Sequence, residues 1–146
     1  MKKLQDIMTK DCVTVTKQDN IFEIAVKMKE HNIGFIPIVE GKSLIGVVTD
    51  RDLVLRGYAD KRSGSGSVEE VMTNKPITAS PDTTVDEASR IMADKQIRRL
   101  PIVQNGELIG VVAIGDLAVH KFSEEEAGKA LSEISEKHRE TVGSTK

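Results

Sequence analysis

A threonine and an aspartate three residues apart, Thr49 and Asp52, are the side chains best placed to do chemistry in this sequence. They follow a largely apolar segment at residues 44–48, which predicts a buried strand that runs directly into a helix. Thr49 is a favourable N-cap, and Asp52 stands where its carboxylate can bond back to the cap, so the pair fits a capping box. The same geometry suits a phosphorylated ligand, because a helix N-terminus carries unpaired N–H groups and partial positive charge. A cap hydroxyl can donate to phosphate, and a carboxylate one turn later can accept from a ribose diol.

The same stretch occurs twice in the chain, 64 positions apart. The letters GVVTDRDL at 46–53 return as GVVAIGDL at 110–117. Without gaps, this shift aligns residues 4–53 with residues 68–117, and 16 of the 50 aligned positions are identical. An internal repeat at a fixed spacing predicts two copies of one structural unit.

The composition is that of a water-soluble protein, with 38% hydrophobic and 30% charged residues among 146. A net charge of −2, an aromatic content of 3% and the lack of tryptophan disfavour nucleic-acid binding, which depends on basic surfaces and stacking platforms. The single cysteine, Cys12, cannot form an intramolecular disulfide, and no apolar run has the length of a signal peptide or a membrane span. We therefore expect a cytoplasmic protein that binds neither membranes nor nucleic acid.

Each half shows the same order of predicted elements: a helical turn, a short strand, a capped helix, a proline-containing strand, a second strand and a final helix. Asn20 and Thr84, each with a glutamate three residues later, mark the starts of the capped helices. Proline cannot donate to a ladder, so its strand should lie at a sheet edge or bend there. In the first half we expect the turn near residues 4–8, the strands near 12–15, 35–39 and 44–48, and the last helix near 50–58. In the second half we expect the turn near residues 68–72 and strands near 77–79 and 100–103.

The fold class follows from these connections. A strand–helix–strand crossover requires parallel neighbours, whereas the hairpin requires antiparallel ones. The sequence therefore predicts an α/β (α+β) fold of two β-α-β-β-α repeats. One half of about fifty residues would be marginal alone, so we expect the halves to pack by pseudo-twofold symmetry. The expected divisions are 1–60 for the first repeat, 61–67 for a flexible Gly/Ser linker, 68–121 for the second repeat, and 122–146 for a C-terminal helix and disordered tail.

The C-terminal segment departs from the repeat. Ser123 and Glu126 form a third capping-box pattern, which predicts a separate helix over about residues 124–135. Its apolar face would pack on the body of the protein or on another subunit. We expect disorder from about residue 136 onward.

Two repeats of this order resemble a tandem pair of cystathionine-β-synthase (CBS) domains, also called a Bateman module. The resemblance rests on the letters IMT at 7–9 and VMT at 71–73, IRRLPI at 97–102 and GVVTDRD at 46–52. It covers residues 1 to about 121 and implies a flat two-repeat unit with two related clefts, often dimerised into a disc. In that family the clefts commonly bind adenosine nucleotides or related adenosyl compounds and regulate an attached or partner protein.

The resemblance implies one site completed by residues of both repeats. Thr49 would contact the phosphate of the ligand, and Asp52 would accept from the ribose hydroxyls. Arg98 and Arg99 would add positive charge, since a guanidinium suits phosphate oxygens; a solvated surface or a salt bridge is the other explanation of that pair. The other repeat would also form the wall at the adenine. The implied residues are Thr49, Asp52, Thr78, Ser80, Val85, Ile97, Arg98 and Arg99.

A second, weaker site would lie at the equivalent position of the other repeat. It departs from the family pattern, because Ala113 replaces the threonine and Gly34 and Phe35 stand where the arginines would be. Losing one hydrogen bond to a charged group costs about 1.5–3 kcal/mol, so we expect this cleft to bind phosphate poorly, to accept a less charged ligand, or to stay empty. The implied residues are Thr14, Thr16, Ile21, Ile33 and Asp116.

An enzyme is one alternative function, and the sequence disfavours it. The histidines His31, His120 and His138 are scattered without metal-ligand spacing, and Cys12 has no activating partner in sequence. No glycine-rich phosphate loop is present. We therefore expect no catalytic residues, no metal and no required cofactor.

The expected function is that of a regulatory module, most simply a homodimer, that binds an adenine nucleotide such as AMP, ADP or ATP between its repeats. A partner protein, which the sequence does not name, would respond to the bound state. The alternative is a ligand-free dimerisation or scaffold module, in which Thr49 and Asp52 survive only as a helix cap.

Overall fold

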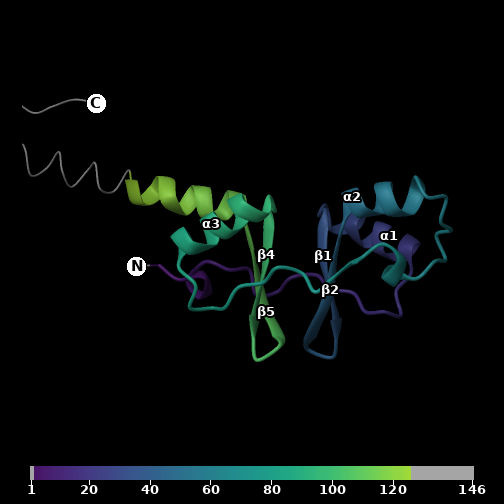
Figure 1. Ribbon diagram of the computed structural model, residues 1–146, viewed down its shortest axis with the longest axis horizontal. Coiled ribbons are helices and arrows are strands. Elements are labelled where there is room, and N and C mark those ends of the chain that lie inside the picture. Colours follow the sequence, from purple (N-terminus) through teal and green to yellow (C-terminus); the bar gives the residue numbers. More distant parts are fainter. Residues whose placement is uncertain (1, 126–146) are drawn as a thin grey trace, which may run out of the picture.

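The computed structural model of the protein describes residues 2–125. This part forms two similar lobes side by side, each built on a β-hairpin with helices packed beside it (Figure 1). The 3-10 turn and the π-helical turn of the first repeat are labelled η1 and η2. In chain order this repeat forms η1 (Leu4–Asp6), α1 (Ile21–His31), β1 (Phe35–Glu40), β2 (Ser43–Thr49), α2 (Asp50–Asp52) and η2 (Leu53–Tyr58).

The second repeat forms η3 (Val68–Glu70), β3 (Thr73–Asn74), α3 (Val85–Lys95), β4 (Arg99–Gln104) and β5 (Glu107–Ala113). The elements α3, β4 and β5 have the lengths of α1, β1 and β2 and begin 64 positions later. A further helix begins at Ile114 and continues through residue 125. The predicted repeat and the mixed helix and antiparallel-sheet fold are confirmed.

Capping boxes start both long helices, as predicted. The Asn20 side chain accepts from the backbone N–H of Glu23 at 2.8 Å, and Thr84 accepts from that of Glu87 at 3.2 Å. Each box satisfies N–H groups that a helix leaves unpaired in its first turn. Both helices end one residue before a left-handed residue with φ of 54°, Asn32 in one case and Gln96 in the other.

The sheet has the strand order β1-β2-β5-β4, with β3 paired to β2. Each hairpin is antiparallel, and the two hairpins meet at Ser43 and Glu107. Two backbone bonds reinforce this junction with pseudo-twofold symmetry. Leu44 N–H donates to the carbonyl of Gly106 at 3.2 Å, and Leu108 N–H donates to that of Lys42 at 2.9 Å.

The proline-containing strands β1 and β4 lie at the two ends of this strand order, as predicted for strands that lack one donor. The carbonyl of Pro37 accepts from Val15 N–H at 3.1 Å, and that of Pro101 accepts from Ala79 N–H at 3.1 Å. The strands expected at 12–15 and 77–79 are therefore reduced to single parallel bridges, at Val15 and Ala79. The parallel pairing predicted for the strand–helix–strand crossover is therefore present in each repeat, but it spans a single residue pair.

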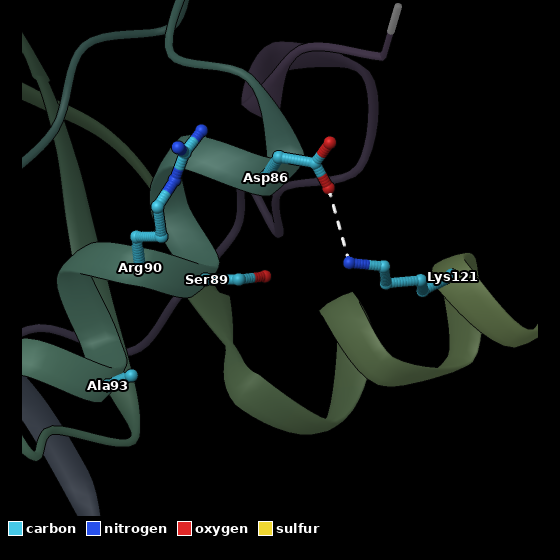
Figure 2. A pocket seen from close by; sticks show the side chains of 5 residues that line it. All are labelled: Asp86, Ser89, Arg90, Ala93 and Lys121. Carbon is cyan, nitrogen blue, oxygen red and sulfur yellow. Dashed lines mark hydrogen bonds and ion pairs between the residues drawn. The ribbon is translucent and has the colours of Figure 1, made fainter.

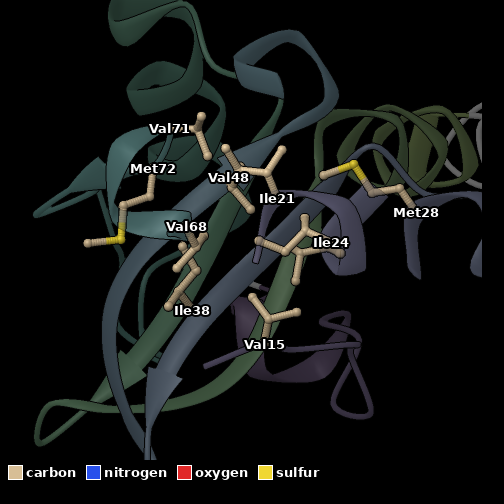
Figure 3. Close-up of a cluster of buried hydrophobic side chains, with 10 residues drawn as sticks. Val15, Ile21, Ile24, Met28, Ile38, Val48, Val68, Val71 and Met72 are labelled. Atoms are coloured by element: carbon tan, nitrogen blue, oxygen red, sulfur yellow. The ribbon is translucent and has the colours of Figure 1, made fainter. Parts of the chain in front are cut away.

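The core of the first lobe includes the opening turn of the second repeat. Val68, Val71 and Met72 are buried against side chains of α1 and of strands β1 and β2, such as Ile24 and Ile38 (Figure 3). The turn reaches this core because β3, which follows directly, pairs antiparallel with β2.

The core of the second lobe includes the opening turn of the first repeat. Leu4 is wholly buried there with residues of α3, β4 and β5, and Thr9 forms an antiparallel bridge with Val111. The opening turns are thus exchanged between the lobes. Gly110 permits this close approach, because a Cβ at that position would lie 2.6 Å from Met8 Sδ and 3.0 Å from the Thr9 carbonyl oxygen.

The segment expected to be a flexible linker lies along the start of α1. The carbonyls of Gly66 and Gly64 accept from the N–H groups of Ile21 and Phe22 at 3.0 and 2.9 Å. These bonds satisfy two donors in the first turn of α1. The linker therefore completes the helix N-terminus as well as joining the repeats.

The helix after β5 corrects one prediction. Ser123 was expected to cap a separate helix, but it lies inside the helix that begins at Ile114. Neither glycine nor proline stands between Leu117 and residue 125 to end that helix, so its first turn simply propagates. Glu126 and the rest of the expected helix and tail lie outside the described residues.

Candidate ligand-binding site

Thr49 and Asp52 form the expected capping box where β2 meets α2. Asp52 N–H donates to Thr49 Oγ1 at 3.1 Å, and Thr49 N–H donates to Asp52 Oδ2 at 2.9 Å. The box engages one lone pair of the hydroxyl and one carboxylate oxygen. The hydroxyl proton of Thr49 and Oδ1 of Asp52 take no part in it, so a donor and an acceptor remain side by side at the end of the strand.

Arg56 fixes Asp52 from the following turn. Its Nε lies 3.9 Å from Asp52 Oδ1, and its Nη1 donates to the carbonyl of Met72 at 2.9 Å. Asp52 is half-buried, with 17% of its side chain exposed. The Asp52 carboxylate is therefore bonded to the Thr49 N–H, lies near the Arg56 guanidinium and keeps a small part of its surface accessible.

The second repeat keeps only half of this arrangement. Ala113 has no hydroxyl, and its N–H donates to Asp116 Oδ2 at a longer 3.4 Å. His120 takes the place of Arg56, and its Nε2 lies 3.3 Å from Glu124 Oε2. Asp116 is exposed, so its carboxylate is held less firmly than that of Asp52.

A cavity of about 380 Å³ opens beside Asp116. Both repeats contribute to it, because the segment after η1 runs along β5 through the Thr9–Val111 bridge. Of the residues implied for the second site, Ile33 and Asp116 line this cavity. Its walls are formed by Thr9, Asp11, Cys12, Val13, His31, Asn32, Ile33, Gly34, Phe35, Pro37, Arg99, Val111, Ala113 and Asp116.

Three residues implied for the second site lie elsewhere. Ile21 is buried in the first core. The carbonyl of Thr14 accepts from Lys27 Nζ at 3.3 Å, and Thr16 N–H donates to Asp19 Oδ2 at 2.9 Å in the turn before α1. The sequence did not single out the lining residues Thr9 and 11–13, because the exchange of opening turns that brings them to β5 leaves no mark in the sequence.

Arg99 also lines the cavity beside Asp116. It pairs with Ala113 in the β4–β5 register, and its Nη1 donates to the carbonyl of Arg98 at 3.2 Å. Arg98 is exposed, and its carbonyl also accepts from Ile114 N–H at 2.9 Å. The arginine pair therefore lies at the start of β4, next to the junction between β5 and the helix that begins at Ile114.

The remaining residues implied for the Thr49 site are spread along the entry to α3. Thr78 is exposed, and Ser80 Oγ lies 3.2 Å from Thr83 Oγ1. Val85 is buried in the second core, and Ile97 packs against that core. Among the implied residues of this site, hydrogen bonds join Thr49 with Asp52 and Arg99 with Arg98, and none joins these two pairs.

Burial raises the pKa of the Cys12 thiol above its ordinary value, with a smaller contribution from Asp11. The backbone N–H of Cys12 opposes this shift only in part. Cys12 is therefore a neutral thiol at neutral pH and adds no charge to the cavity beside Asp116.

A second hollow, of about 400 Å³, lies between α3 and the helix that begins at Ile114 (Figure 2). It is lined by Asp86, Ser89, Arg90 and Ala93 of α3 and by Lys121, whose Nζ lies 3.4 Å from Asp86 Oδ1. Both side chains of this ion pair are about half exposed, so it contributes little to stability.

Two features are absent from residues 2–125. No three His, Cys, Asp or Glu side chains in this range lie close enough together to hold a metal ion. None of the helices described there combines the length and apolar character needed to cross a bilayer.

Known proteins resemble the chain over most of its length. A 48% identical protein of Bacillus subtilis, described as uncharacterized protein YlbB, aligns over 138 residues, or 93% of each chain. An inosine-5′-monophosphate dehydrogenase of Korarchaeum cryptofilum is 38% identical over 118 residues, but the match spans only 24% of that enzyme. The solved CBS domain pair of protein MJ0100, in complex with 5′-methylthioadenosine and S-adenosyl-L-methionine, is 28% identical, with a TM-score of 0.76 over 85% of this chain and 98% of that one.

The family model for the CBS domain matches residues 4–57 and again residues 68–121. These two matches coincide with the internal repeat, and each ends within the helical segment that follows its Gly-Val-Val strand. The chain therefore belongs to the CBS-domain family and carries a tandem pair of these domains.

Proposed function

We propose that this CBS pair is a regulatory module that binds an adenosine ligand, such as AMP, ADP or ATP, in the cleft beside Thr49 and Asp52. The observation that carries the proposal is the fixed capping box, which leaves the Thr49 hydroxyl proton and Asp52 Oδ1 free of the box. A hydroxyl donor suits a phosphate oxygen, and a carboxylate oxygen suits a ribose diol. The ligands of the MJ0100 pair, both adenosyl compounds, support the choice of adenosine.

Pseudo-twofold symmetry supplies the rest of the proposed cleft. Moved by 64 positions, Ile33, Gly34 and Phe35 of the cavity beside Asp116 correspond to Ile97, Arg98 and Arg99, which we assign to the wall of the proposed cleft at Thr49. The same shift relates its residues 9 and 11–13 to residues 73 and 75–77, just before the Thr78 and Ser80 that the family resemblance implied. The proposed adenine wall is therefore residues 73–77 with Ile97, and Val85 supports it from the core.

The sensing mechanism follows from where this cleft lies. A ligand there would contact β2 of one repeat and the start of β4 of the other. The two hairpins themselves share a single ladder pair, between Ser43 and Glu107, at the ends away from Thr49. A ligand that bridges the repeats would add contacts at the other end of the hairpins. A partner protein would respond to the changed relation of the two lobes.

The module would act without catalysis of its own. The dehydrogenase that resembles it is matched over 24% of its length, as expected where a CBS pair is attached to a separate catalytic domain. The proposal requires no cofactor.

Isothermal titration calorimetry with AMP, ADP, ATP and adenosine tests the proposal. Asp52→Ala should weaken nucleotide binding roughly ten- to a hundredfold, since a hydrogen bond to a charged group contributes about 1.5–3 kcal/mol. Asp50→Ala is the matched control, because Asp50 lies in the same helical turn and its carboxylate accepts only from the N–H of Arg51 among described residues 2–125. If Asp52→Ala bound the nucleotide as tightly as the unsubstituted protein does, the assignment of the site to Asp52 would be refuted.

The second candidate function is a ligand-free dimerisation module, and exposed apolar side chains favour it. Leu55 and Tyr58 after β2 are 47% and 87% exposed, and their equivalents Val119 and Phe122 after β5 are 66% and 62% exposed. Apolar side chains repeated at equivalent positions suit a self-complementary homodimer interface. A monomer that binds nucleotide would reject this alternative, and a dimer that binds none would support it; light scattering measures the mass.

A further inference from the structure

Arg56 joins the Asp52 carboxylate to the opening turn of the second repeat. Its Nε lies 3.9 Å from Asp52 Oδ1, and its Nη1 donates to the carbonyl of Met72 at 2.9 Å. The same Nη1 lies 3.5 Å from the carbonyl oxygen of Val71. One planar guanidinium therefore contacts the carboxylate of the first repeat and the backbone where η3 passes into β3.

The backbone that Arg56 contacts leads directly into one wall of the proposed cleft. β3 begins at Thr73, the residue after Met72, and pairs with β2 at Val47. Residues 73 and 75–77 stand 64 positions after residues 9 and 11–13, which line the cavity beside Asp116. Arg56 therefore links Asp52 to the start of the proposed adenine wall.

The Asp52 carboxylate has only one hydrogen bond that limits its orientation. Oδ2 accepts from Thr49 N–H at 2.9 Å, and Oδ1 is the oxygen left for a ribose diol. The terminal torsion of an aspartate is broad, so a single bond to Oδ2 leaves Oδ1 free to turn. The positive charge of Arg56 on the Oδ1 side restricts this turning. At 3.9 Å, Nε is too distant for a hydrogen bond, so the lone pairs of Oδ1 stay available to the ligand.

The second repeat has the same carboxylate without an arginine. His120 stands at the position of Arg56. The backbone N–H of Ala113 donates to Asp116 Oδ2 at 3.4 Å, whereas the equivalent bond to Asp52 is 2.9 Å long. Both donors are backbone N–H groups, so the missing threonine hydroxyl takes no part in the longer bond. The shorter bond thus accompanies the arginine.

We propose that Arg56 is a positioning residue of the nucleotide site, which holds Asp52 Oδ1 toward the ribose and ties it to the start of the adenine wall. The inference rests on the proposed function, because it assumes that Asp52 accepts from the ribose hydroxyls. It adds that recognition of the ribose depends on a residue that does not touch the ligand. Ribose recognition and the anchoring of the second repeat's opening turn then share one guanidinium.

Two nucleotides that differ only in their ribose hydroxyls test this role. The ribose preference is the Kd of 2′,3′-dideoxy-AMP divided by the Kd of AMP, both measured by calorimetry. It should be roughly ten- to a hundredfold in the unsubstituted protein, because the deoxygenated sugar cannot donate to the carboxylate. Arg56→Met keeps a long apolar stem and removes the guanidinium. It should lower the preference about threefold or more and leave the Kd of 2′,3′-dideoxy-AMP nearly unchanged.

A double-mutant cycle shows whether Arg56 acts through Asp52. In an Asp52→Ala background, Arg56→Met should not change the ribose preference, because the carboxylate that it positions is gone. Arg56→Lys should recover part of the preference, since it keeps a positive charge near Asp52 but lacks the fork that also reaches Met72.

Arg62→Ala is the matched control. Arg62 Nη1 lies 3.2 Å from Glu70 Oε2, and its Nε donates to the carbonyl of Arg56 at 3.0 Å. It therefore also fastens η3, but within residues 2–125 it forms no hydrogen bond or ion pair with Asp52. Arg62→Ala should keep the ribose preference of the unsubstituted protein.

The outcomes separate this inference from the proposed function. An unchanged ribose preference in Arg56→Met would overturn the positioning role and leave the nucleotide site in place. Equal losses of affinity for both nucleotides, or an equal loss of preference in Arg62→Ala, would overturn it as well, because they indicate general loosening of the fold. If the unsubstituted protein binds no nucleotide, or binds AMP without a ribose preference, the role of Asp52 in the proposed function fails first and the inference fails with it.

Discussion

Leu4 belongs to the core of the other repeat, and this exchange can be tested by removing its side chain. Leu4 is wholly buried with residues of α3, β4 and β5, such as Met92 and Leu100. A buried leucine replaced by alanine costs roughly 2.7–5 kcal/mol, because the contacts are lost and a cavity remains. For a chain of this size each kcal/mol lowers Tm by about 3 °C, so Leu4→Ala should lower Tm by about 8–15 °C.

The assay combines calorimetric unfolding with amide chemical shifts of the folded variant. Shift changes in Leu4→Ala should gather in α3 and β4, far along the chain from the substitution. Val68→Ala is the matched control, because Val68 is the equivalent wholly buried residue of the other opening turn and packs in the first core. Its shift changes should gather in α1 and β1. If Leu4→Ala instead disturbed α1 and β1, the exchange of opening turns would be refuted.

Three further variants and conditions test local features. Gly110→Ala should lower the free energy of unfolding by about 1–3 kcal/mol, because the new Cβ would lie 2.6 Å from Met8 Sδ, whereas Gly115→Ala, in open space, should not lower it. A backbone hydrogen bond at the α3 capping box lowers the pKa of Glu87 below its ordinary value of 4.5. Its stabilising effect is therefore present above that value and lost as the pH falls through the folded-state pKa, so Glu87→Gln should flatten the acid side of a urea-unfolding pH profile. Because burial raises the pKa of Cys12, its thiol should react with a disulfide reagent at about pH 8 more slowly than free cysteine does, and an equal rate would contradict this.

The parts of the fold that depend on neighbouring residues could be predicted from the sequence. The capping boxes at Asn20, Thr49 and Thr84 each need only a cap and an acidic residue three positions later, and all three are present. The repeat of 64 positions also predicted two similar halves. This prediction is confirmed, because the lengths of α1, β1 and β2 recur in the second repeat.

The exchange of opening turns could not be predicted in the same way. Leu4 and Met8 have nearly the same chemical character as their equivalents Val68 and Met72, so either turn would satisfy either core by burial alone. The choice is made by pairing between segments that are distant in sequence, such as Thr9 with Val111. Sequence patterns show which residues of an element are apolar. They do not show whether that apolar face packs against the first or the second copy of the repeat.

The same exchange explains why the residues implied for the second site coincide only in part with the lining of the cavity beside Asp116. The residues implied by family resemblance included Ile33 and Asp116, which line the cavity, and Ile21, which is buried in the first core. The lining also includes Thr9 and residues 11–13, since the turn before them is anchored in the opposite lobe. The helix that continues through Ser123 is a further case, because a capping pattern marks a start only where the preceding residues are not already helical.

The most direct test of nucleotide sensing is a titration of the ¹⁵N-labelled protein with AMP, followed by amide chemical shifts. Binding in the proposed cleft predicts saturable shifts at Thr49 and Asp52 together with Ile97, Arg98 and Arg99, so that both repeats respond to one ligand. Shifts confined to one repeat, or none with any adenosine nucleotide up to millimolar concentration, would contradict a ligand held between the repeats.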